Sequence, residues 1–229
     1  MQIGTDLVLL SSMATVVIAL FLTTYLGRKW LSQEVRLITD LPLVFAIAFV
    51  GQAFNIMIVT LQHTGLLPPT MLFFRIRTVG IGGSIIPIFG AILQIWAPSI
   101  QRYHNRMVYA LALYWLVIDF FVATETLIMT LLIPVLIILG TMMMFTFIIT
   151  WRTGRLKEVR SELMIISVLF GMSSQILRVP LLSTTLFYLP DVLLTISMVL
   201  TAIAFANPWY QREIKTPLET SQHMVAISD

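Results

Sequence analysis

The sequence predicts an all-α integral membrane protein, a bundle of seven transmembrane helices with the N-terminus outside and the C-terminus inside. Two observations predict this fold class: hydrophobic residues make up 58% of the chain, and charged residues only 11%. A soluble domain of average composition has roughly 25% charged residues, so this chain has too few to cover a wetted surface. The apolar residues also form continuous runs and do not alternate with polar ones, which argues against a β-barrel.

Each predicted helix is a window of about 20 mostly apolar residues, the length that crosses the hydrocarbon core. The first window lacks a basic leader and a small-residue cleavage site, so we expect it to be retained as a helix. In chain order the windows are Leu7–Leu26, Leu43–Leu61, Met71–Trp96, Met107–Ala123, Thr126–Trp151, Leu163–Leu182 and Leu186–Ala206.

The orientation follows from the basic residues outside these windows, which all fall on one side of the predicted membrane. Lysine and arginine follow the first, third, fifth and seventh windows, and the segments at the other side carry none. Because basic loops stay in the cytoplasm, the odd number of spans leaves the N-terminus outside. These basic residues are Arg28, Lys29, Arg36, Arg102, Arg106, Arg152, Arg155, Lys157, Arg160, Arg212 and Lys215.

We treat residues 1–229 as a single seven-helix domain with a cytoplasmic tail at 210–229. Residues 7–102 and 126–212 share landmarks in the same order, such as P-x-x-Q-R at Pro98–Arg102 and again at Pro208–Arg212. One interpretation is a parallel three-plus-one-plus-three repeat around a linker helix at 107–123, as in some transporter folds. The other is chance similarity between apolar helices.

A layer of polar residues is predicted in the outer third of the membrane. A charge isolated in hydrocarbon costs roughly 2.5–3.5 kcal/mol on insertion scales, so the intramembrane charges need partners or a function. Helical spacing places amides and a hydroxyl beside them. The candidate layer comprises Gln52, Asn55, Arg77, Asp119, Gln175, Arg178, Asp191 and Thr195.

Two interpretations of this layer remain open. The residues either fix helix register through ion pairs and hydrogen bonds, or they line a pocket open to the outside. Arginine outnumbers aspartate among the intramembrane charges, and it binds carboxylates in a bidentate manner, so a pocket would favour an anionic ligand. The repeat alignment pairs Arg77 with Asp191 and predicts an ion pair between them.

The glycines of the third window, Gly80, Gly82, Gly83 and Gly90, are typical of close helix packing through small residues.

Several function classes lack the residues that they need. The chain has no cysteine, and His63, His104 and His223 lie far apart outside the predicted spans or at their edges. We therefore expect no metal site, no catalytic residues and no cofactor, and we interpret the chain as non-enzymatic. The basic residues lie in short loops that the membrane topology already explains, so nucleic acid is not an expected partner.

The topology, the size and the segment LFYLPDVLLT (Leu186–Thr195) resemble the microbial rhodopsins. That family has seven helices with the N-terminus outside, and an Asp on the seventh helix followed four residues later by the retinal-binding Lys. The resemblance places Asp191 at the Asp position and Thr195 at the Lys position. Because Lys29, Lys157 and Lys215 lie outside the spans, it implies an opsin-like architecture without a retinal Schiff base.

Three functions remain open at this point. The first is a receptor-like protein of the plasma or inner membrane that senses or binds a small, anionic ligand from the outer side. The second is an accessory subunit of a larger membrane complex, and the third is a small-solute transporter. The expected partners are the lipid bilayer and either other membrane subunits or a cytoplasmic protein on the basic face.

Overall fold

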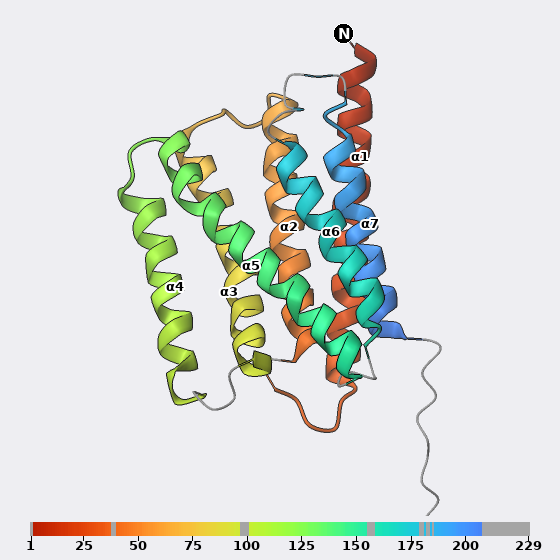
Figure 1. Ribbon diagram of the computed structural model, residues 1–229. Coiled ribbons are helices and arrows are strands. Elements are labelled where there is room, and N and C mark those ends of the chain that lie inside the picture. Colours follow the sequence, from red (N-terminus) through yellow and green to blue (C-terminus); the bar gives the residue numbers. More distant parts are fainter. Residues whose placement is uncertain are drawn as a thin grey trace, which may run out of the picture.

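The computed structural model describes residues 2–37, 40–96, 101–154, 159–178, 181, 184 and 186–207. This part of the chain contains seven α-helices and no strand. They alternate in direction along the chain (Figure 1). The helices are α1 (Gln2–Leu31), α2 (Leu41–His63), α3 (Met71–Trp96), α4 (Gln101–Phe121), α5 (Glu125–Thr153), α6 (Ser161–Arg178) and α7 (Leu189–Ala206).

The helix ends coincide with local stop signals in the sequence. The hydroxyl of Thr124 accepts a hydrogen bond from the Leu127 amide and caps the start of α5, as threonine commonly does. Gly154 ends α5 in the left-handed conformation, with φ of 63°, and Asn207 ends α7 in the same way, with φ of 36°. Glycine and asparagine tolerate this conformation best.

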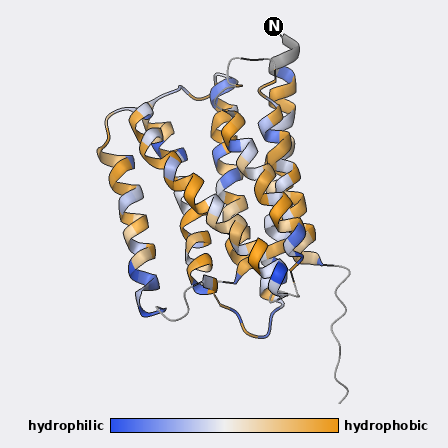
Figure 2. Ribbon diagram, in the orientation of Figure 1, coloured by the Kyte–Doolittle hydropathy of each residue, from blue (hydrophilic) through white to orange (hydrophobic). Residues whose placement is uncertain are grey.

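Five of the helices, α1, α2, α3, α5 and α7, are long and apolar enough to cross a membrane. The described part of α6 is a shorter apolar helix, and α4 begins with a polar turn that contains Arg102 and Arg106. Figure 2 shows hydrophobic residues along most of every helix and hydrophilic residues at the first turns of α4. The sequence therefore predicted the helical class and the five apolar helices correctly.

The helices form a ring in which each one packs on its neighbours in the chain, and α7 closes the ring against α1. Helix α3 also contacts α5. Helix α4 packs mainly on α3 and stands at the edge of the bundle (Figure 1).

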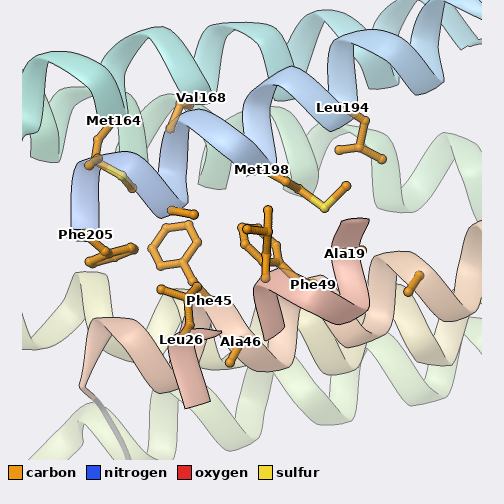
Figure 3. Packing of buried hydrophobic residues seen from close by; sticks show 14 of the residues in the cluster. Ala19, Leu26, Phe45, Ala46, Phe49, Met164, Val168, Leu194, Met198 and Phe205 are labelled. Carbon is orange, nitrogen blue, oxygen red and sulfur yellow. The ribbon is translucent and has the colours of Figure 1, made fainter. Parts of the chain in front are cut away.

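Two apolar clusters fill the interior. The larger one joins α1, α2, α5, α6 and α7 around Phe45, whose ring lies 5.2 Å from that of Phe205 and 6.3 Å from that of Phe49. Met198 and Met164 close the same cluster from α7 and α6 (Figure 3). The smaller cluster joins α3, α4 and α5 and is built on Trp115, Ile118, Ile128 and Leu132.

Glycines allow several of these helices to approach closely, as expected for the third window. A Cβ atom on Gly51 of α2 would lie 2.8 Å from the Gly80 carbonyl oxygen of α3. A Cβ atom on Gly82 of α3 would lie 2.6 Å from the Trp115 Nε1 atom of α4. In contrast, Gly83 has open space around its Cα atom. The packing role of Gly80 and Gly82 is therefore confirmed.

Candidate functional site: the polar layer

Asp191 joins α7 to α1 near the start of α7. Its side chain is only 5% exposed, and its Oδ2 atom accepts a hydrogen bond of 2.5 Å from the Ser12 hydroxyl. One turn further along both helices, the hydroxyl oxygens of Thr15 and Thr195 lie 2.8 Å apart. The Thr195 hydroxyl also bonds the Asp191 carbonyl oxygen at 3.0 Å. Asp191 lies in the first turn of α7, where the helix dipole favours a negative charge.

Arg77 lies half-buried on α3 and is oriented by α2. Its Nε atom donates to the Asn55 side-chain oxygen at 3.1 Å, and its Nη1 atom donates to the Gln62 side-chain oxygen at 3.5 Å. Asn55 and Gln62 are seven residues apart, which is two helical turns, so they share one face of α2. The side-chain oxygen of Gln52, on the same helix, is buried without a hydrogen-bond donor in the described part of the chain.

Asp119 is fully buried, with an exposed fraction of 0%, in the last turn of α4. Neither of its carboxylate oxygens has a hydrogen-bond partner among the described residues. Arg75 of α3 is the nearby charge that acts on it. However, the Nη2 atom of Arg75 donates to the Val122 carbonyl oxygen at 3.1 Å, so Arg75 caps the C-terminus of α4.

The members of the predicted layer bond with different helices. Asp191 and Thr195 bond with α1, Arg77 bonds with Asn55 and Gln62 of α2, and Asp119 lies on α4. Gln175 is exposed on α6, and the side chain of Arg178 lies outside the described residues. The predicted Arg77–Asp191 ion pair stays a prediction.

Sequence reasoning missed the α1 hydroxyl groups that contact this layer. Ser12 and Thr15 lie three residues apart on α1, a spacing that places them on one face and that was a usable signal. On α6 the residue that reaches α7 is Ser174, whose hydroxyl donates to the Pro190 carbonyl oxygen at 2.7 Å. Ser174 and Gln175 are adjacent and so project about 100° apart, which explains why Gln175 faces outward.

A second hydroxyl cluster joins α6 and α7 nearer their other ends. The Ser167 hydroxyl lies 2.6 Å from that of Thr201 and 3.1 Å from that of Ser197, and it donates to the Ser197 carbonyl oxygen at 2.8 Å. Short hydroxyl side chains of this kind commonly link helices in lipid. Helix α7 is thus connected by hydroxyl groups to both of its neighbours.

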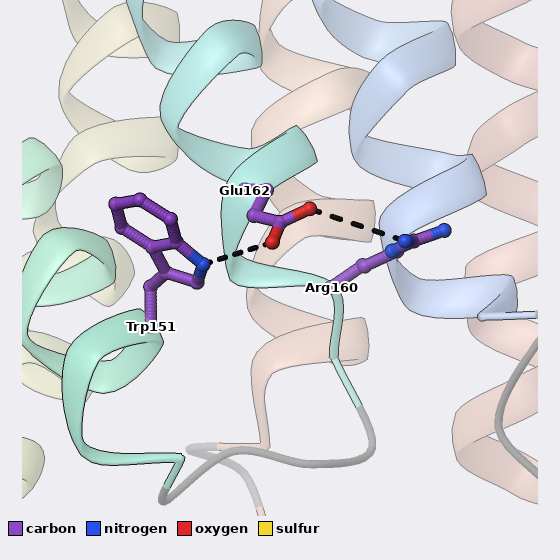
Figure 4. A network of polar contacts seen from close by, with 3 residues as sticks. All are labelled: Trp151, Arg160 and Glu162. Carbon is purple, nitrogen blue, oxygen red and sulfur yellow. Dashed lines mark hydrogen bonds and ion pairs between the residues drawn. The ribbon is translucent and has the colours of Figure 1, made fainter.

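Tryptophans mark the opposite end of the bundle from the polar layer. Trp30, Trp96 and Trp151 lie near the ends of α1, α3 and α5, which are at the same end of the bundle (Figure 1). The Trp151 indole nitrogen donates to Glu162 at 2.8 Å, and Glu162 lies 3.9 Å from Arg160 (Figure 4). Exposed tryptophans with a bonded N–H group are typical of a membrane–water interface.

The arrangement favours binding or structural roles for the polar layer. The described residues contain no group of three or more His, Cys, Asp or Glu side chains that could hold a metal ion. The chemistry that the layer offers is hydrogen bonding by an oriented guanidinium, carboxamides, carboxylates and hydroxyls. No family model matches the chain, and the comparisons with curated proteins and with solved structures gave no match.

Proposed function

We propose that this chain is a seven-span, non-enzymatic membrane protein, N-terminus outside, that binds a small anionic ligand from the outer side. The observation that carries the proposal is the orientation of Arg77 by Asn55 and Gln62. Two carboxamides on one face of α2 accept hydrogen bonds from the guanidinium and so orient its planar set of donors. A guanidinium oriented in this way suits a carboxylate ligand.

The location of Arg77 supports binding from the outside. It lies in the second turn of α3, close to the α2–α3 connection at the end opposite the tryptophans. In the proposed topology this connection is external, and the basic ends of α1, α3 and α5 are cytoplasmic.

The two alternative functions draw less support from the geometry. A transporter needs a polar route through the bundle, whereas an apolar cluster packs between α1, α2, α5, α6 and α7 (Figure 3). An accessory subunit needs a face for another chain. The exposed apolar side of α4 offers such a face, and contact with lipid accounts for it equally well.

Ligand binding is tested with the purified chain in mild detergent. We expect a panel of acetate, succinate, glutamate and citrate to contain an anion that raises the thermal midpoint above that in chloride at equal ionic strength. Arg77→Gln should abolish the increase, and Arg77→Lys should retain little of it, because an ammonium lacks the planar fork. If no anion raises the midpoint, or if Arg77→Gln responds as the parent does, this function is wrong.

The topology is tested separately by labelling cysteines. The chain contains no cysteine, so a single cysteine introduced at an exposed position is the only one that can react. We expect a membrane-impermeant maleimide to label Thr64→Cys on intact cells, and to label Ser32→Cys only after the cells are opened. The reverse pattern would contradict the proposed orientation.

A further inference from the structure

A basic and aromatic cluster lies at the start of α4, outside the polar layer. The guanidinium carbon of Arg102 lies 4.7 Å from the centre of the Tyr103 ring, and that of Arg106 lies 5.6 Å from it. All three side chains are exposed. Two guanidinium groups therefore lie against one tyrosine ring on the surface.

This arrangement is electrostatically unfavourable in the absence of an anion. Like charges four residues apart destabilise a helix, and cations are disfavoured at a helix N-terminus, where the dipole is positive. The first turn of α4 carries no acidic residue. Neither Arg102 nor Arg106 forms an ion pair with an acidic side chain in the described part of the chain.

The cluster lies at the end of the bundle that carries Trp30, Trp96 and Trp151 (Figure 1). Trp96 ends α3, the helix on which α4 packs, and its side chain is 46% exposed. Tryptophans gather at the level of lipid headgroups. Arg102 and Arg106 are therefore at the depth where lipid phosphates are found.

We propose that Arg102, Tyr103 and Arg106 form a binding site for the phosphate of an anionic phospholipid headgroup. Two guanidiniums bind one phosphate through charge-assisted hydrogen bonds, and the Tyr103 ring holds them in place through cation–π contacts. The phosphate supplies the negative charge that the first turns of α4 lack. In the proposed topology the site faces the inner leaflet, and the binding chemistry does not depend on that orientation.

The site is tested by titrating the purified full chain in uncharged detergent with three probes: dihexanoylphosphatidylglycerol, dihexanoylphosphatidylcholine and inorganic phosphate. We expect a saturable rise in the thermal midpoint with the phosphatidylglycerol, weakened by added salt, and none with the phosphatidylcholine. The double variant Arg102→Gln/Arg106→Gln should bind the phosphatidylglycerol about tenfold or more weakly, as the loss of a charge-assisted hydrogen bond requires. Tyr103→Leu should weaken binding less.

The matched control is Arg28→Gln/Arg36→Gln, which removes two exposed basic residues at the same end of the bundle. It should bind the phosphatidylglycerol as the parent does. Equal loss in both double variants would overturn the proposal in favour of general surface charge, and so would equal responses to the two lipids. Inorganic phosphate that binds as tightly as the phosphatidylglycerol would overturn the lipid assignment. Reversed labelling of Thr64→Cys and Ser32→Cys would refute the topology and leave this titration unchanged.

Discussion

The two buried aspartates of the bundle differ in what surrounds them. Asp191 accepts a 2.5 Å hydrogen bond from Ser12 and lies beside the Thr15–Thr195 contact. Asp119 is buried at least as deeply, but both of its oxygens lack a donor in the described part of the chain. A buried polar group stabilises a fold only when its hydrogen bonds are satisfied. Asp191 therefore stabilises the α1–α7 contact. Burying Asp119 costs free energy, which the packing around it offsets.

The helices around each aspartate differ in the same way. Hydroxyl groups link α7 to α1 and to α6. The contact between α3 and α4 depends instead on Trp115, which fits over Gly82 and donates to the Thr78 carbonyl oxygen at 2.9 Å. Hydroxyl groups make the directional bonds on one side of the bundle, whereas the other side combines a close glycine–tryptophan contact with the indole hydrogen bond.

The largest expected effect is that of Asp191→Ala. It should lower the free energy of unfolding by about 3 kcal/mol, because it leaves the Ser12 hydroxyl without its acceptor and opens a small cavity. The measurement is unfolding in mixed detergent micelles, followed by circular dichroism. A loss under about 1 kcal/mol, the size of an ordinary neutral hydrogen bond, would contradict the conclusion that Asp191 stabilises the α1–α7 contact.

The next effect concerns the packed side of the bundle. Gly82→Ala should cost about 2 kcal/mol, in the range of overpacking a close contact, because Trp115 must move and its bond to Thr78 is disturbed. The measurement is unfolding followed by the fluorescence of Trp115, in a chain whose other tryptophans are replaced by phenylalanine. The matched control is Gly83→Ala, where the added methyl group meets nothing within 4 Å; an equal loss in both variants would refute the packing role.

Ser12→Ala removes the hydroxyl that donates to Asp191 and so tests this hydrogen bond alone. We expect a loss of about 1.5 kcal/mol, the contribution of a hydrogen bond to a charged group. Ser11→Ala is the control, since the Ser11 hydroxyl donates within its own helix, to the Val8 carbonyl oxygen. Equal unfolding free energies for the two variants would show that the Ser12–Asp191 bond does not stabilise the contact.

The smallest expected effect is that of Asp119→Asn. The substitution removes a buried carboxylate that lacks hydrogen-bond donors in the described part of the chain. Burying such a charge is unfavourable, so the free energy of unfolding should change by less than about 0.5 kcal/mol or rise. A loss comparable to that of Asp191→Ala would mean that both aspartates stabilise the folded state.

The sequence by itself determined the helical class, the apolar helices and the importance of the glycines in α3. These follow from properties that neighbouring residues carry: continuous hydrophobicity, and small side chains at helical spacing. Asp191 and Arg77 were also recognisable, because a charge in an apolar run is conspicuous wherever its partner lies.

Only the tertiary structure decided which partner each polar residue takes. Ser12 and Asp191 are separated by 179 residues, and nothing in the local pattern of α1 specifies that its hydroxyl face meets α7. The direction in which a side chain points also depends on how each helix is rotated about its axis, which is set by packing against its neighbours. That rotation exposed Gln175, turned Ser174 toward α7, and left Asp119 buried without a hydrogen-bond donor among the described residues.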